Sequence, residues 1–190
     1  MRGILNAGRV MMILMLALPA GALAQPAAPQ ATPSIFLVVP GLGVGQWTVD
    51  GKVADYVWVM GDSQITETRP SGTDLVFRPQ LEERSWSSTP RIFIVYLPTS
   101  SIVWAVGTDD PHTRTIDRVG VGSTQDQVTA AYQDPQAVLE LPLRSRTMIY
   151  DSRGIAFESE YLPAAGQFSA KIGRVFVFRP GQARAIWRLQ

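Results

Sequence analysis

"DRVGVGSTQDQVTAAYQDPQ", residues 117–136, contains the signals for the start, the body and the end of a helix in the right order. Ser123 is the expected N-cap, because a serine hydroxyl can accept a hydrogen bond from a backbone N–H of the first helical turn. Val128 and Tyr132 follow at helical spacing, and Pro135 ends the pattern. The stretch therefore predicts an amphipathic helix that begins at Ser123 and stops before Pro135.

A second stretch, "TVDGKVADYVWVMGDSQ" at residues 48–64, has the same order of signals. Both stretches share the spacing G-x-x-x-D-x-V. The shared positions are Gly51, Asp55 and Val57 in the first copy and Gly122, Asp126 and Val128 in the second. Lys52–Met60 is apolar on both faces, so this segment is either a helix or a buried strand. The parallel with the second copy favours a helix.

Most of the remaining sequence is typical of β-strands, because short runs rich in Val, Ile, Phe and Tyr alternate with Pro and Gly. The predicted strands are residues 74–79, 91–98, 101–107, 137–142, 146–151, 154–163, 174–180 and 183–189. Several connections are too short for parallel crossovers, so neighbouring strands should pair antiparallel. Together these patterns predict an α+β fold of two repeated modules, residues 34–113 and 114–190. Each module would have one helix packed on a short antiparallel sheet.

The N-terminus has the layout of a secretory signal peptide. Arg2 and Arg9 give a positive start, Val10–Leu18 is apolar, and Ala22-Leu23-Ala24 is a small-residue cleavage site. The apolar segment is shorter than the about 20 residues that a membrane-spanning helix needs. Residues 25–33, "QPAAPQATP", then form an extended Pro/Ala-rich tether. We therefore expect an exported protein, periplasmic or secreted, without an integral membrane span after cleavage.

The composition excludes several classes of function. Removal of residues 1–24 takes away two basic residues and changes the formal net charge from +1 to −1. Without a basic surplus to neutralise phosphates, nucleic acid is not an expected partner. The chain contains no cysteine, which excludes thiolate metal sites, thiol nucleophiles and disulfides.

The Gly122–Pro135 segment resembles the motif G-x-S-x-x-[DE]-V-x-x-x-[LY]-G-x-P. This motif opens the tandem modules of the β-lactamase inhibitory protein family and the domain of SmpA/OmlA-type outer-membrane assembly lipoproteins. The corresponding residues are Gly122, Ser123, Asp126, Val128, Tyr132 and Pro135 in the second copy, and Gly51, Asp55, Val57 and Gly61 in the first. Of these, Ser123, Asp126, Asp55 and Gly61 each lie one residue earlier than in the motif. The resemblance implies an exported binding module that uses a sheet surface, and it implies no particular partner. We expect a non-catalytic protein that binds a protein or envelope component. The acylated cysteine of the lipoproteins is absent here.

An alternative is a serine ester hydrolase, because "VWVMGDSQITE" at residues 57–67 resembles the first block of GDS-type hydrolases. Ser63 would be the nucleophile, His112 the base and Asp109 the acid that orients it. That family also uses an asparagine in the oxyanion hole, and the only asparagine of this chain lies in the predicted signal peptide. Gly, Asp and Ser also favour turns, so the binding interpretation is preferred.

Two other motifs do not lead to a cofactor or a metal. Asp109, Asp110, His112 and Asp117 are hard ligands, but they lack the spacing and the glycine pivot of a calcium loop. The glycine-rich stretch Phe36–Trp47 has Gln46 where a dinucleotide fingerprint needs its third glycine. The sequence therefore predicts no cofactor and no metal site.

Trp86 is the one tryptophan within a polar stretch, "EERSWSSTP" at residues 82–90. Exposed aromatic side chains are frequent anchors in protein interfaces. We therefore expect Trp86 to be exposed and to contribute to binding a partner.

Overall fold

The computed structural model describes residues 36–61, 65–70, 81–86 and 90–189. The predicted signal peptide, the tether and the predicted strand 74–79 lie outside them. The helices are α1 (Val53–Met60), α2 (Gln125–Tyr132) and α3 (Ala183–Ile186). The strands are β1 (Phe36–Val39), β2 (Gly43–Val44), β3 (Trp47–Thr48), β4 (Ile65–Pro70), β5 (Glu82–Trp86), β6 (Ile92–Leu97), β7 (Ile102–Thr108), β8 (Thr113–Thr115), β9 (Ala137–Leu141), β10 (Ser145–Tyr150), β11 (Ile155–Leu162), β12 (Gln167–Phe168) and β13 (Arg174–Phe178). Within these ranges no helix is long and apolar enough to cross a membrane.

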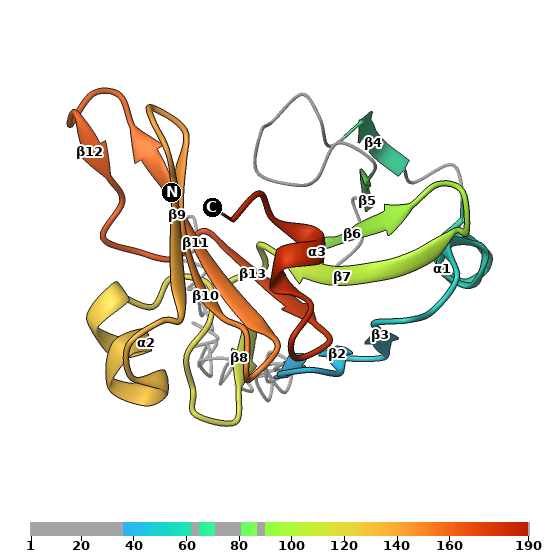
Figure 1. Ribbon diagram of the computed structural model, residues 1–190, viewed down its shortest axis with the longest axis horizontal. Helices are drawn as coiled ribbons and strands as arrows, with labels where there is room; N and C mark the ends of the chain where they lie inside the picture. The colour runs from blue at the N-terminus through green and yellow to red at the C-terminus, as the bar shows by residue number, and fades with distance from the viewer. Residues whose placement is uncertain (1–35, 62–64, 71–80, 87–89, 190) are drawn as a thin grey trace, which may run out of the picture. The chain divides into compact units, whose positions relative to one another are not determined.

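The largest sheet has nine strands in the order β4-β5-β6-β7-β13-β11-β10-β9, with β12 pairing to β11 beside this path. Its neighbours are antiparallel throughout. In the central pair, Val106 of β7 lies opposite Val177 of β13, and Gly107 lies opposite Phe176. Figure 1 shows β6, β7 and β13 side by side, although β13 comes much later in the chain. Strands from the first and second halves of the chain therefore form one continuous sheet.

A second, smaller sheet has four strands in the order β3-β2-β1-β8. Strands β1, β2 and β3 pair antiparallel through two tight turns. On its other side β1 pairs in parallel with β8, so that Val38 lies opposite Thr115. This pairing connects the start of the described chain to the segment between β7 and α2. The small sheet carries the loop that leads into α1.

The two faces of the nine-stranded sheet belong to separate hydrophobic clusters. The alternation of side chains along β13 places Val177 in one cluster and Phe176 in the other. Helices α1 and α2 cover the first face, where Tyr56 and Val128 are among their buried residues. Helix α3 and Trp187 cover the second face. The sheet is therefore buried on both sides over much of its length.

A charged residue joins three strands on the second face. The Nε atom of Arg174 in β13 lies 2.7 Å from Glu158 in β11, and its Nη1 atom lies 3.2 Å from Glu83 in β5. The guanidinium also lies over the rings of Phe93 and Phe176, at 5.2 and 5.0 Å from their centroids. Truncation of one partner of such a group leaves an uncompensated charge in a partly buried site. Arg174 therefore links strands that lie on both sides of the β7–β13 junction.

The expected fold of two repeated helix-plus-sheet modules is wrong. Within the described ranges the protein is mostly β, with thirteen strands and three short helices. The expected modules, residues 34–113 and 114–190, do not have a short sheet each, because β7 of the first pairs with β13 of the second. Two separate sheets would each leave an open edge of unpaired backbone groups, and the pairing removes both edges.

Both predicted helices are confirmed, but the N-cap of the second differs from the prediction. Thr124, not Ser123, caps α2, since its hydroxyl accepts a hydrogen bond from the backbone N–H of Gln127 at 3.2 Å. The Gln127 side chain in turn accepts from the backbone N–H of Thr124 at 2.9 Å, which completes a capping box. The Ser123 hydroxyl instead accepts from the backbone N–H of Gly120 at 3.0 Å.

The motif shared by the two stretches does not place equivalent residues at equivalent helix positions. In α1 the N-cap is Lys52, so Asp55 is the third helical residue and accepts a hydrogen bond from the Lys52 N–H at 3.1 Å. In α2 the N-cap is Thr124, so Asp126 is only the second helical residue. The two aspartates therefore match in the sequence but have different roles in the helices.

The predicted strands at residues 91–98, 101–107, 137–142, 146–151, 154–163 and 174–180 are confirmed with small shifts at their ends. The prediction of a strand at residues 183–189 is wrong, because α3 begins there. The carboxylate of Asp151 accepts a hydrogen bond from the backbone N–H of Ala183 at 2.9 Å, which satisfies one of the free donors at the helix start. Ile186 and Trp187 then pack into the second cluster.

We predict that Gly107→Ala destabilises the protein by about 1–3 kcal/mol, because an added Cβ atom overpacks the β7–β13 junction. This atom would lie 2.6 Å from the Phe176 ring and 3.1 Å from the carbonyl oxygen of Val175. Urea unfolding measures the change. The matched control is Gly173→Ala, whose Cβ meets its nearest atom at 3.6 Å and should change stability by less than about 0.5 kcal/mol. Equal stability of the two variants would contradict this packing.

Candidate functional site

Helix α1 has an apolar outer face that the described chain leaves uncovered. Asp55 is its only charged residue, and Tyr56 is among the residues that it buries against the sheet. On the outer face Trp58 is 89% exposed and Val59 is 58% exposed. A helix that is apolar on nearly all sides is normally covered on all sides. We call Trp58 and Val59 the α1 surface.

An aromatic stack holds the inner side of α1. The Tyr56 ring lies 5.5 Å from the Trp47 ring and 6.3 Å from the Trp86 ring, with interplanar angles of 27° and 26°. The Tyr56 hydroxyl donates a hydrogen bond to the carbonyl oxygen of Thr48. The indole N–H of Trp86 donates to the carbonyl oxygen of Gly61 at 3.2 Å. Because rings and hydrogen bonds act together, α1 is fixed in its rotation about its own axis.

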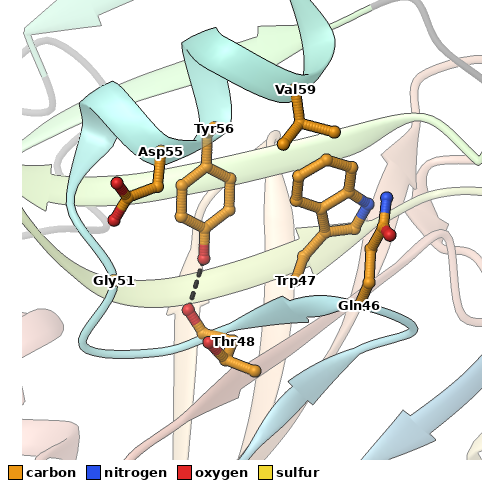
Figure 2. A pocket seen from close by; sticks show the side chains of 7 residues that line it. All are labelled: Gln46, Trp47, Thr48, Gly51, Asp55, Tyr56 and Val59. Atoms are coloured by element: carbon orange, nitrogen blue, oxygen red, sulfur yellow. Dashed lines mark hydrogen bonds between the residues drawn. The ribbon is translucent and has the colours of Figure 1, made fainter.

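A hollow of 190 Å³ opens beside this stack, and we call it the Trp47 hollow. Its lining residues are Gln46, Trp47, Thr48, Gly51, Asp55, Tyr56 and Val59. Figure 2 shows that Tyr56 and Val59 come from α1, whereas Trp47 comes from the chain below it. Val59 belongs both to the hollow and to the α1 surface, so the two features are continuous.

Two carboxylates, those of Asp55 and Asp50, lie near the Trp47 hollow. Burial, and then the negative charges of Asp55 and Asp50, raise the pKa of the Tyr56 phenol well above its ordinary value. The Asp50 carboxylate is paired with Arg179, at 2.6 Å from its Nη2 atom. Asp55 forms no ion pair with any side chain that the structure describes. An uncompensated carboxylate therefore stands at the aromatic wall of the hollow.

A second hollow of 240 Å³ lies next to the Asp50–Arg179 ion pair. Ile102, Trp104 and Gln182 complete its lining. The indole N–H of Trp104 is buried and has no hydrogen-bond partner within the described ranges. A buried donor without a partner costs about 1–3 kcal/mol, so Trp104 is a weak point of this region.

The prediction that Trp86 is exposed is wrong. Its side chain is completely buried in the first hydrophobic cluster, at the end of β5. Trp86 lies opposite Ile92 of β6 and beneath Tyr56 of α1. The polar residues before it, Glu82–Ser85, form the rest of β5, the second strand from the edge of the sheet. The exposed tryptophan of this region is Trp58 of α1.

The residues of the alternative hydrolase do not form the expected acid–base pair. His112 contacts Asp110, with 3.0 Å between its Nδ1 atom and a carboxylate oxygen. Asp109 is instead paired with Arg91 at 3.0 Å, and burial raises the pKa of Asp109 even though Arg91 acts in the opposite direction. Ser63 lies outside the described residues. The predicted Asp109–His112 pair is therefore wrong, because each residue has a different partner.

The acidic residues of this loop do not form a metal site with the rest of the described chain. Across those residues, no group of three His, Cys, Asp or Glu side chains comes together in a way that could hold a metal ion. Asp110 is nearly buried and is occupied by hydrogen bonds from the backbone N–H and the ring of His112. These bonds shape the turn between β7 and β8.

We predict that Trp58 is the tryptophan most accessible to acrylamide. Trp58→Phe should remove the largest share of the quenchable fluorescence, because the indole is almost fully solvated. Trp86→Phe should leave that share unchanged, because the Trp86 side chain is shielded from solvent. Steady-state quenching of the two folded variants measures both effects. A larger loss in Trp86→Phe would contradict the orientation of α1.

No family model matches the chain, and no curated protein matches it. Among solved structures, it is similar to the uncharacterized protein yfeY from Escherichia coli, with a TM-score of 0.45, 8% identity and coverage of 74% of this chain and 99% of that chain. It is also similar to a cysteine-rich secretory protein from Staphylococcus aureus, with a TM-score of 0.42, 12% identity and coverage of 77% of this chain and 50% of that chain. Both TM-scores are too low to assign a fold or a function to this chain.

Proposed function

We propose that this protein is an exported, non-catalytic binding protein whose partner docks on the α1 surface. The observation that carries the proposal is the 89% exposure of Trp58 on a helix with a single charged residue. Tryptophan is the residue most enriched among the side chains that dominate interface energetics. Val59 extends the apolar area beside it. A partner protein of the cell envelope would remove this area from water on binding.

Export is supported by the sequence before the described chain. Arg2, Arg9, the apolar run and the Ala22-Leu23-Ala24 site together match the layout of a cleavable signal peptide. The partner is therefore expected in the periplasm or outside the cell.

We predict that the exported protein begins at Gln25, because cleavage follows Ala24. Mass spectrometry of the protein recovered from the periplasmic or culture fraction measures its N-terminus. Ala24→Leu should block cleavage and retain residues 1–24, since a large side chain does not fit a small-residue site. Recovery of an uncleaved wild-type chain from the cytoplasm would contradict export.

We predict that Trp58 contacts the partner directly. A photo-crosslinking amino acid placed at position 58 should form an adduct of one defined mass in cells. The same amino acid at position 116 is the matched control, because Ile116 is 78% exposed but lies outside α1. The crosslinked partner can then be identified and purified.

With the isolated partner, Trp58→Ala should weaken binding by about 2 kcal/mol or more, which is about a thirtyfold change in Kd. Ile116→Ala should leave the Kd within about twofold of the wild type. Titration calorimetry measures both values, and thermal unfolding verifies that the variants are folded. Unchanged affinity of Trp58→Ala, or equal crosslinking at both positions, would contradict docking on α1.

A further inference from the structure

The Trp47 hollow adjoins the α1 surface closely enough for one partner to occupy both. Val59 lines the hollow and is also 58% exposed beside Trp58. A protein seated on Trp58 and Val59 therefore also contacts the lining of the hollow, through Val59. This geometry allows a side chain of the partner to enter it.

The size of the hollow suits one side chain better than a complete small molecule. Its volume is 190 Å³, below the roughly 300–1,000 Å³ that is typical of pockets for drug-sized ligands. The hollow is partly open to solvent, and Val59 of the α1 surface is among its lining residues. A side chain of a docked partner fits this volume and can enter through the opening, because the backbone of the partner stays outside.

The walls of the hollow select a positive charge. Trp47 and Tyr56 provide aromatic rings, and a cation close to such a ring is attracted by the negative charge of the ring face. Figure 2 shows these two rings side by side, with the Asp55 carboxylate next to Tyr56. One oxygen of Asp55 accepts a hydrogen bond from the backbone N–H of Lys52 at 3.1 Å. Within the described ranges its other oxygen makes no hydrogen bond and no ion pair.

The nearby charges do not compensate Asp55. Within the described ranges Lys52, the N-cap of α1, forms no ion pair with Asp55, and Arg179 is committed to Asp50 at 2.6 Å. This ion pair faces the second hollow, which Asp50 and Arg179 both line. The raised pKa of the Tyr56 phenol reflects the negative charges of Asp55 and Asp50 after burial. An anion in the hollow would meet repulsion, whereas a cation would meet an unused carboxylate.

We infer that the Trp47 hollow is the subsite for a lysine or arginine side chain of the protein that docks on the α1 surface. This inference rests on the proposed binding function and names the chemistry that the partner must present. The cationic head lies against Trp47 and Tyr56 and pairs with Asp55. Trp58 and Val59 contact the apolar surface around that basic residue.

The test uses the exported protein and a probe of known chemistry, Nα-acetyl-L-arginine amide. Two-dimensional NMR of the ¹⁵N-labelled protein follows the indole N–H signal of Trp47. The probe should shift this signal with millimolar affinity. Nα-acetyl-L-citrulline amide has nearly the same shape without the charge, so it should bind at least about threefold more weakly. Added salt should weaken binding of the arginine probe and leave binding of the citrulline probe unchanged.

Asp55→Asn is the informative variant, because an asparagine oxygen can still accept the hydrogen bond from Lys52. It should lower the affinity for the arginine probe by about threefold or more. Asp126→Asn is the matched control, since Asp126 is also an exposed carboxylate in the first turn of a helix. This control should bind the probe like the wild type, and the spectra show directly whether both variants fold.

Three outcomes would overturn the inference. The first is equal binding of the arginine and citrulline probes, and the second is an unchanged affinity in Asp55→Asn. The third is binding of tetramethylammonium without binding of the arginine probe, which would indicate a small quaternary ammonium ligand.

If Trp58→Ala weakens binding of the isolated partner and Asp55→Asn does not, the proposed docking on α1 is retained and only the charge preference is wrong. If the arginine probe binds at Trp47 but Trp58→Ala does not change the affinity for the isolated partner, the proposed docking surface is wrong and the cation subsite is retained.

Discussion

The pairing of β7 with β13 is the constraint on which the rest of the structure depends. Each of these strands has another partner on its far side, so their contact turns two groups of strands into one sheet. The alternation along β13 then supplies both hydrophobic clusters, with Val177 on one face and Phe176 on the other. Arg174 strengthens this junction, since its two glutamate partners come from strands on either side of it.

The same sheet determines which side of α1 faces water. The first cluster receives Tyr56, and the stack of Trp47, Tyr56 and Trp86 fixes how the helix is turned. Residues two positions apart on a helix point in nearly opposite directions, so a buried Tyr56 requires an outward Trp58. The exposure of Trp58 is thus a consequence of the packing beneath it.

Local features of the fold could be predicted from the sequence, whereas the partners of each strand could not. Runs such as residues 174–180 show their strand character in their own composition, and Pro135 shows where a helix must stop. The contact of β7 with β13 joins segments far apart in the chain, and neither segment indicates its partner. The predicted modules failed for this reason, because short loops imply local pairing but do not exclude a distant one.

The candidate site was missed for a related reason. Trp86 has polar neighbours, and its burial depends on Ile92 and Tyr56, which are contributed by other elements. The apolar character of both faces of Lys52–Met60 was visible in the sequence, and it was interpreted as an ambiguity between helix and strand. In a helix with one buried face, that same character means that the other apolar face is exposed to solvent.

The separation of β7 and β13 in the sequence has a consequence for the route by which the protein folds. The central pair of the sheet forms between residues 102–108 and residues 174–178, so the sheet stays divided until the last strand has been synthesised. Contacts between distant segments form slowly, because closing a long loop costs entropy before the contact is gained. A chain of this topology can complete its central strand pair only after residue 178 has been synthesised.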